Sequence, residues 1–259
     1  MEIKSVGFIG GGRITQILIE GMKRSEGLSV PFVVSDTNQS ALDALKSRFP
    51  DITLHLNDNA APAMCDLVFL ALHPPAIGRV LPDIASFLKP QGIFVSLAPK
   101  FTIAKLTQGL NGYSRITRII PNAPALIGYG FNPIAFSETL SDSDRRSLIS
   151  ILTPLGEFPE TPENLLEAYA IVTAMGPTYF WFQWSELKAL AMEFGLSERE
   201  ANVGIYKMLG GALETMFSSG LTEAQMLDLI PLKPIGEEEP AIRGILKSKL
   251  TALYEKLKI

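Results

Sequence analysis

The sequence is poor in the residues that build disulfide frameworks and metal centres. Its 259 residues include one cysteine, Cys65, and two histidines, His55 and His73. A single cysteine excludes an internal disulfide, and these three scattered residues do not have the spacing of a zinc site. We therefore expect no metal centre and a fold held together by buried apolar side chains.

An excess of charge of one sign and long uninterrupted apolar runs are also lacking. Lys and Arg number 23 against 27 Asp and Glu, and a net charge of −4 gives no general attraction to nucleic acid or anionic lipid. The N-terminus carries neither a basic segment nor a small-residue cleavage site. One uncharged stretch, residues 168–185, is interrupted by Gly176-Pro177 and falls short of the ~20 residues of a membrane helix. We predict a cytoplasmic protein without nucleic-acid or membrane partners.

Short apolar runs alternate with helical patterns through the first 120 residues. The runs predict five strands, at residues 6–9, 30–34, 67–72, 93–97 and 116–120. Helical spacing of apolar residues between them predicts helices such as residues 14–22, 77–88 and 103–110. Strands that alternate with helices form crossover units, so the pattern predicts an α/β fold with a parallel sheet.

Beyond Pro121 this alternation weakens, and from Pro162 onward only helices are predicted, at residues 164–175, 179–194, 198–218, 222–229 and 241–257. We therefore predict a Rossmann-type domain at residues 1–160 and an all-helical domain at residues 161–259. The helical domain contains five aromatic residues within positions 179–184. A small helical domain can rarely bury so many rings, which favours a subunit interface over packing within the domain.

A glycine-rich turn follows the first predicted strand. Residues 10–15, Gly-Gly-Gly-Arg-Ile-Thr, fit the pattern G-x-G-x-x-(small) at the start of a helix. Gly10 permits the tight turn and Gly12 lets the backbone approach a pyrophosphate, while the helix start with Arg13 and Ile14 offers free N–H groups. The context predicts a dinucleotide-binding loop; the alternative is a turn used only for packing.

The second strand leads into Ser35 and Asp36. A carboxylate at this point accepts hydrogen bonds from the 2′-hydroxyl of an adenosine ribose and repels a 2′-phosphate. No Lys or Arg follows until Lys46. We therefore predict NAD or NADP as cofactor, with NAD favoured by Asp36. The alternative role of Asp36 is to cap the next helix.

The third apolar run, residues 67–72, leads into His73 and Pro74. Ligands of open α/β sheets lie beyond the carboxyl ends of the strands, so Ala71, Leu72, His73 and Pro74 are predicted to line the cofactor cleft. For His73 we favour a contact with ribose or nicotinamide over a role as proton donor. His55 is predicted to be a surface residue.

Several segments resemble the pyrroline-5-carboxylate reductases, which reduce a cyclic imine to proline. Residues 6–12 are similar to the family's GFIGAGNM, residues 67–74 to VVFLAVKPQ, residues 118–128 to RVMPNTPALVG, and residues 195–201 to GLPREEA; Gly176, Pro177 and Tyr179 match SGSGPAY. The resemblance implies a Rossmann domain and a helical domain that joins two subunits into a homodimer or a higher oligomer. It also implies an active site between the subunits, with Asn122 beside the nicotinamide ring.

The family's substrate loop, SPGGTT, is missing. After Ile230 the chain reads Pro-Leu-Lys-Pro-Ile-Gly at residues 231–236, followed by three glutamates. In the reductases this loop holds the substrate carboxylate with backbone N–H groups; here Lys233 offers a point charge instead. Glu237 lies near the position of the last threonine and would protonate an imine nitrogen if burial raised its pKa. The alternative for Glu237 is a solvated helix start.

Three further segments depart from the family: Arg13 replaces an asparagine, His73 replaces a lysine, and Thr-Ala-Met at residues 173–175 replaces SGS. We predict an NAD(P)H-dependent oxidoreductase that acts on CH–NH groups of a small cyclic imine, in proline biosynthesis, with Tyr179, Lys233 and Glu237 as catalytic candidates. Two alternatives stay open. One is a reductase of the same fold with a different imine or a hydroxyacid as substrate; the other is a dinucleotide-binding sensor without turnover.

Overall fold

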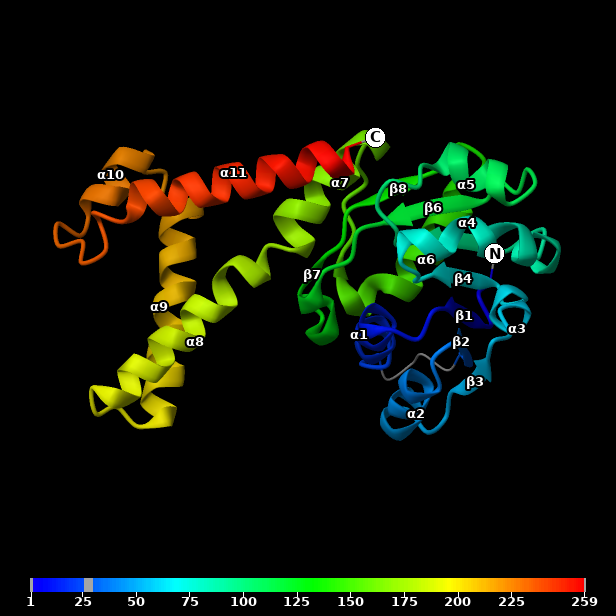
Figure 1. Ribbon diagram of the computed structural model, residues 1–259, viewed down its shortest axis with the longest axis horizontal. Coiled ribbons are helices and arrows are strands. Elements are labelled where there is room, and N and C mark those ends of the chain that lie inside the picture. The colour runs from blue at the N-terminus through cyan, green and yellow to red at the C-terminus, as the bar shows by residue number, and fades with distance from the viewer. Residues whose placement is uncertain (1, 26–29, 259) are drawn as a thin grey trace. The chain divides into compact units, whose positions relative to one another are not determined.

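The computed structural model describes residues 2–25 and 30–258, which form two compact units (Figure 1). The first unit extends to Met175 and includes the end of the chain from Tyr254; the second comprises residues 176–253. The predicted boundary between domains at residues 160 and 161 concerns independent folding, and it stays a prediction.

The first unit is built on a seven-stranded sheet with the order β3-β2-β1-β4-β5-β6-β8. Its strands are β1 (Val6–Ile9), β2 (Phe32–Asp36), β3 (Thr53–Leu56), β4 (Leu67–Leu70), β5 (Ile93–Ser96), β6 (Ile116–Ile119) and β8 (Ile134–Phe136). All neighbours are parallel except β8, which runs antiparallel to β6. A separate parallel pair joins β7 (Gly130–Phe131) to β9 (Gly156–Glu157). The predicted α/β fold with a Rossmann-type parallel sheet is confirmed.

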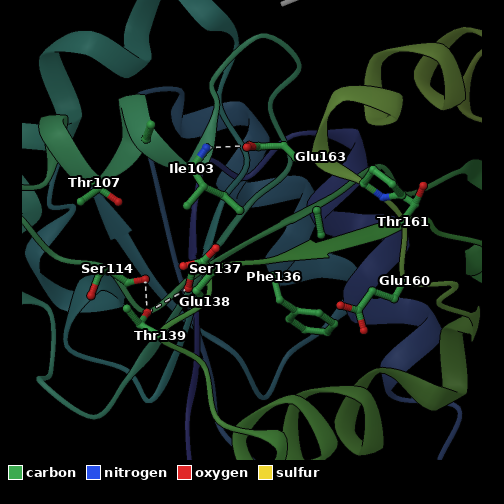
Figure 2. A pocket seen from close by; sticks show the side chains of 13 residues that line it. Ile103, Thr107, Ser114, Phe136, Ser137, Glu138, Thr139, Glu160, Thr161 and Glu163 are labelled. Carbon is green, nitrogen blue, oxygen red and sulfur yellow. Dashed lines mark hydrogen bonds between the residues drawn. The ribbon is translucent and has the colours of Figure 1, made fainter.

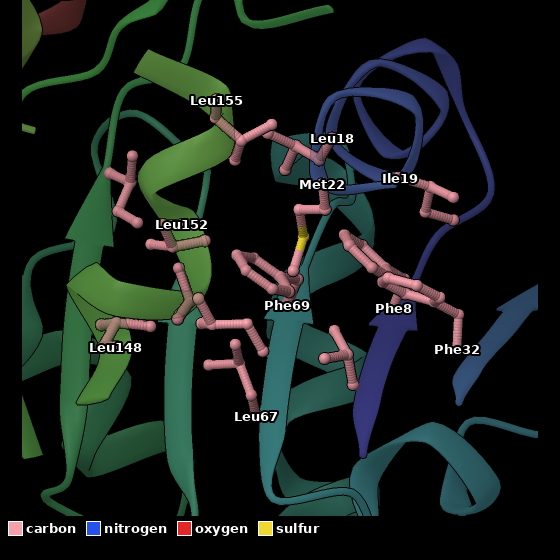
Figure 3. Close-up of a cluster of buried hydrophobic side chains, with 14 of the residues drawn as sticks. Phe8, Leu18, Ile19, Met22, Phe32, Leu67, Phe69, Leu148, Leu152 and Leu155 are labelled. Atoms are coloured by element: carbon pink, nitrogen blue, oxygen red, sulfur yellow. The ribbon is translucent and has the colours of Figure 1, made fainter. Parts of the chain in front are cut away.

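Apolar side chains cover both faces of the sheet, which explains why its strands are continuous apolar runs. On one face, Phe8 and Phe69 stack with ring centroids 4.6 Å apart and pack in a cluster with residues of α1 (Arg13–Met22) and α6 (Asp142–Leu152) (Figure 3). On the other face, residues of α4 (Pro74–Ile84) and α5 (Ile103–Gly109) pack in a second cluster. Two cores therefore fix the sheet from which the glycine turn extends.

The edge of the sheet beyond β2 contains elements that the sequence did not predict. After α2 (Gln39–Arg48), β3 forms the edge strand and the short helix α3 (Ala60–Ala63) leads to β4. No residue of β3 is buried, so it lacks the apolar run that revealed the central strands. His55 lies on β3 with its Nδ1 3.4 Å from an Asp58 carboxylate oxygen, and its side chain is partly exposed.

At the end of the first unit, the chain forms three consecutive helical segments. A 3₁₀ turn (Glu163–Leu165) leads into α7 (Leu166–Tyr169), which continues as a π-helix over Ala170–Ala174. The N–H of Met175 donates to the Ala170 carbonyl at 3.0 Å, the i→i+5 pairing of a π-helix. The helix predicted at residues 164–175 is therefore present with a change of helical type, which is frequent at functional sites.

The second unit contains α8 (Pro177–Glu193), α9 (Glu198–Ser218), α10 (Glu223–Asp228) and most of α11 (Glu239–Leu257). The predicted helical C-terminal region is confirmed. Ser197 caps α9 in a capping box with Glu200. Of residues 176–253, all of which the structure describes, only Gly176 and Ala201 are buried. Among the described helices, none is both long and apolar enough to cross a membrane.

Candidate functional site

A cavity of about 690 Å³ opens at the carboxyl ends of β1, β4, β5 and β6. Each strand leads directly into a loop that contributes to its wall. The lining residues are Gly12, Arg13, Ile14, Ala71, Leu72, His73, Pro74, Leu97, Pro99, Ile120, Pro121, Ala170, Ala174 and Met175. In open α/β sheets this edge is where ligands bind. The cavity therefore brings together seven of the residues predicted to bind a cofactor.

A second cavity, of about 720 Å³, lies beside α5 and the edge strand β8 (Figure 2). Two of its hydroxyl groups are already engaged: the Ser137 and Thr139 side-chain oxygens lie 3.0 Å apart, and Thr139 donates to the Ser114 carbonyl at 2.7 Å. No residue of the glycine turn lines it. The cavity at the strand ends is therefore the better candidate site.

The glycine turn is held closed by contacts that leave no room for a side chain at Gly10. Its φ is +105°, and a Cβ atom there would lie 2.4 Å from the carbonyl oxygen of Ala71. Thr15 is fully buried and donates from its hydroxyl to the Gly10 carbonyl at 2.6 Å. Thr15 at the third small position of the pattern thus stabilises the turn rather than disrupting it.

The backbone beside the cavity is suited to a phosphate group. A Cβ atom at Gly12 would meet no atom of the described chain within 4 Å, so its side-chain position points into open space. Gly12 also precedes α1, where no described side chain caps the first N–H groups. Open space and uncapped N–H groups at a helix N-terminus fit the pyrophosphate of a dinucleotide.

Asp36 links the glycine turn to the second strand. One carboxylate oxygen accepts the Gly11 N–H at 2.6 Å, and the other accepts the Asn38 N–H at 2.8 Å. Asn38, rather than Asp36, caps α2, with its side-chain oxygen accepting from Ser40. Asp36 stays partly exposed, and each of its oxygens keeps a further lone pair, so it can still accept a ribose hydroxyl.

Ser35 and Lys46 are both engaged away from the cavity. The buried Ser35 hydroxyl donates to the Asn59 side chain at 2.7 Å. The Lys46 ammonium donates to the carbonyls of Pro50 and Ile52 at 2.8 and 2.9 Å. These bonds hold Lys46, the first cation after Asp36, at the end of α2.

His73 and Arg13 are both exposed at the rim of the cavity. His73 precedes α4, whose first two residues are Pro74 and Pro75. Because prolines have no N–H group, this helix start offers fewer backbone donors than α1 does. An anion in the cavity would depend on α1 for backbone donors, with Arg13 and His73 as the nearby side-chain donors.

Asn122 lies behind the cavity wall. Its side-chain oxygen accepts the Phe131 N–H at 3.2 Å, and its own N–H donates to the Asn132 side chain at 3.2 Å. The neighbouring Ile120 and Pro121 line the cavity, whereas Asn122 does not. In this arrangement Asn122 fixes the turn after β6, and Pro121 supplies the adjoining surface.

The three catalytic candidates belong to the second unit. Lys233 is exposed and lines a groove of about 420 Å³ together with apolar residues such as Ile230 and Ile242, and Glu237 is also exposed. Tyr179 lies at the start of α8, and burial raises the pKa of its hydroxyl. The groove that Lys233 lines includes neither Glu237 nor Tyr179.

Some residues of the cavity escaped prediction from the sequence. Leu97 and Pro99 follow β5, and the rule that placed Ala71 after β4 would also have found them. Ala170 and Ala174 reach the cavity from the π-helix, which the sequence pattern does not reveal. No group of His, Cys, Asp and Glu within the described ranges could hold a metal ion.

Comparisons with known proteins extend over almost the entire chain. The model of the family described as "NADP oxidoreductase coenzyme F420-dependent" matches residues 5–100. Pyrroline-5-carboxylate reductases of Corynebacterium melassecola and Pseudomonas aeruginosa are 22% and 25% identical, over 96% and 98% of this chain and 93% of each relative. The predicted resemblance to the pyrroline-5-carboxylate reductases is confirmed. The crystal structure of the Plasmodium falciparum pyrroline carboxylate reductase with NADP bound superposes with a TM-score of 0.82 at 21% identity, over 99% of this chain and 97% of that one, which shows a shared fold.

Proposed function

We propose that this chain is an NAD(P)H-dependent reductase that delivers hydride to the C=N bond of a small cyclic imine such as pyrroline-5-carboxylate. The observation that carries the proposal is the cavity at the strand ends, which combines the open space at Gly12 with the uncapped start of α1. Full-length similarity to pyrroline-5-carboxylate reductases supports the choice of substrate class.

The residues of the first unit have distinct roles in this proposal. The N–H groups at the start of α1 hold the pyrophosphate, and Arg13 adds a charge at its rim. Asp36 accepts a ribose hydroxyl at the far end, which favours NAD over NADP. Ala71, Leu72 and Pro121 orient the nicotinamide and exclude water from it. The bound dinucleotide supplies the hydride.

Substrate binding is assigned to the second unit. Lys233 attracts the substrate carboxylate, and Tyr179 orients the ring through its hydroxyl. Glu237, which is exposed in this chain, delivers a proton to the imine nitrogen once bound substrate covers its carboxyl. Orientation and one proton are the main requirements that such a reduction places on the protein. The residues at 231–236 differ from the SPGGTT loop, which favours a second candidate function, a reductase of the same fold with a different imine or a hydroxyacid as substrate. A dinucleotide sensor without turnover is the third.

We also propose that the chain acts as a homodimer through its helical region. Large apolar side chains on the second unit are exposed, among them Phe182, Phe194, Tyr206 and Phe217. A second copy of the same surface is the simplest partner that would cover them.

Oxidation of NADH and of NADPH with pyrroline-5-carboxylate tests the activity directly by absorbance. We expect turnover with both cofactors and a higher kcat/KM with NADH, because the Asp36 carboxylate repels a 2′-phosphate. Asp36→Ser removes that carboxylate, and we expect it to reduce the preference for NADH.

Two results would separate the alternatives. Turnover of another imine or a hydroxyacid, with none of pyrroline-5-carboxylate, would establish the second candidate function. Calorimetric binding of NADH without turnover of any of these compounds would refute the reductase assignment and leave the sensor.

A further inference from the structure

Arg118 is a charged residue buried within the first unit. It lies on β6 with 1% of its side chain exposed. Its Nη1 donates to Glu163 Oε1 at 3.0 Å, and its Nη2 donates to Glu167 Oε1 at 2.6 Å and to the Ala98 carbonyl at 3.4 Å. Charge-assisted hydrogen bonds of this kind are shorter and stronger than bonds between neutral groups. One guanidinium therefore joins β6, the loop after β5 and the start of α7.

The same two carboxylates also hold the loop after β5. Glu167 Oε1 accepts the Lys100 N–H at 2.9 Å, and Glu163 Oε1 accepts the Ile103 N–H at 2.6 Å, which Figure 2 shows at the margin of the second cavity. Lys100 has a φ of +70°, a conformation that is uncommon for a residue with a side chain. Strained backbone of this kind persists only where its surroundings hold it. Here its N–H bond to Glu167 does so.

The segments joined by Arg118 carry much of the cavity wall. Leu97 and Pro99 flank Ala98, Ile120 and Pro121 follow Arg118 along the chain, and Ala170 and Ala174 lie on the helix that begins beside Glu167. The glycine turn and Asp36 lie at the other side, towards β2. If the pyrophosphate lies at the glycine turn and the adenosine at Asp36, the nicotinamide extends towards the walls that Arg118 joins.

We propose that Arg118 is a positioning residue which, through Glu167 and Glu163, sets the nicotinamide end of the cavity and leaves the phosphate end unaffected. It does not touch the cofactor; it holds the loop with Pro99 and the π-helix with Ala174 at fixed positions relative to β6. The inference rests on the proposed dinucleotide binding, and it names residues that the comparison with the reductases does not assign.

Two ligands separate the ends of the cavity. ADP-ribose carries the adenosine and both phosphates of NADH but has no nicotinamide. In Glu167→Gln we expect NADH affinity, measured by calorimetry, to fall about tenfold, because the loop with Pro99 and the π-helix with Ala174 are no longer held in the geometry that fits the nicotinamide. We expect ADP-ribose affinity to stay within about twofold, because Gly12 and α1 are untouched. General damage to the fold would instead weaken both ligands together.

The matched control is Glu160→Gln. Glu160 lies three residues before Glu163 and pairs with Arg145 at 2.9 Å, but it is largely exposed and forms no bond to Arg118. This control should leave both affinities unchanged. Glu163→Gln is the milder test variant, because the Glu163 side chain is 28% exposed. If Glu167→Gln does not fold, Glu163→Gln alone tests the positioning role of Arg118. We expect a smaller weakening of NADH binding in the same direction.

The outcomes distinguish this proposal from the proposed function. A wild-type protein that binds neither ligand refutes dinucleotide binding itself. The second outcome is that the wild type binds NADH more tightly than ADP-ribose and that Glu167→Gln and Glu163→Gln keep the same ratio of the two affinities. This outcome refutes only the positioning role. Equal weakening of both ligands in the folded variants also refutes it, since the effect would then be a general one.

Discussion

In the first unit, here called the sheet unit, Phe8, Phe69 and Phe94 have no exposed surface. In the second unit, residues 176–253, here called the helical unit, Phe182, Tyr206 and Phe217 are two-thirds or more exposed. The difference does not come from composition, since both parts are rich in large apolar residues. It comes from layering: a sheet with helices on both faces buries its own apolar side chains. The helices of residues 176–253 leave most of theirs uncovered.

This contrast has a thermodynamic consequence. Burial of apolar surface is the main favourable contribution to folding, so the sheet unit carries its own stability. The helical unit gains most of its burial only when another surface covers it. Its stability is therefore expected to depend on protein concentration, as it does in dimers whose isolated subunits have small cores.

The largest expected effect is on the buried core of the sheet unit. Phe69→Ala removes a ring that stacks on Phe8 and leaves a cavity, and we expect it to lower the free energy of unfolding by about 3–5 kcal/mol. Circular dichroism in a urea titration measures the change. Phe87→Ala is the matched control, because Phe87 is 42% exposed in the same unit, and it should cost less than about 1 kcal/mol. Equal losses in the two variants would contradict the assignment of the core.

The next effect concerns the exposed face of the helical unit. Phe182→Asp places a charge on α8 where we propose contact with a second copy. Burying an unpaired charge is unfavourable, so we expect association to weaken by about 2 kcal/mol or more and a dimer to dissociate into monomers. Sedimentation velocity over a range of concentrations measures it.

Phe87→Asp is the control for this substitution, because it adds the same charge to an exposed aromatic position of the sheet unit. It should leave the sedimentation coefficient unchanged. The proposed interface near Phe182 would be contradicted if the wild type stays monomeric at every concentration. It would also be contradicted if the Phe182→Asp variant stays dimeric.

A smaller effect is expected for a substitution in the glycine turn that weakens cofactor binding without affecting the stability of the fold. Gly12→Ala adds a methyl group that meets no described atom of the chain, so the fold should tolerate it. The methyl group would occupy space proposed for the pyrophosphate, and we expect NADH affinity to fall about tenfold, equivalent to about 1.4 kcal/mol. Calorimetry and a thermal melt of the same sample measure the two effects.

Gly10→Ala is the informative partner of that variant. Its Cβ atom would clash with the Ala71 carbonyl at a φ of +105°, so we expect loss of stability as well as of binding. If Gly12→Ala binds NADH as the wild type does, the phosphate does not lie at this turn.

The strands of the sheet were predictable because each central strand is buried on both faces and therefore forms an apolar run, as at residues 67–70. The edge strand β3 was not, since none of its residues is buried and it shows no such run. The cavity residues beside Gly12 followed from the rule for strand ends. The bond from Arg118 to Glu167 spans 49 residues, and the π-helix covers only Ala170–Ala174. Neither feature has a local signal in the sequence.

The smallest effect tests whether ion pairs at the rim of the sheet add to the stability of its core. Burial by itself raises the pKa of the Asp66 carboxyl, but hydrogen bonds from Lys89, Ser5 and the Lys4 N–H outweigh burial and hold this pKa below its ordinary value. A carboxyl whose pKa is lower in the folded state stabilises the fold above its unfolded pKa of about 4, and this contribution is lost as pH falls through the folded pKa.

We expect Asp66→Asn to lower the free energy of unfolding by about 1 kcal/mol at pH 7, and we expect the difference from the wild type to shrink towards pH 3. Urea midpoints across this pH range measure it, with Asp83→Asn on the exposed side of α4 as control. A difference that is constant with pH would mean that the Asp66 bonds act through geometry alone and that the stability of the sheet unit comes from its apolar core.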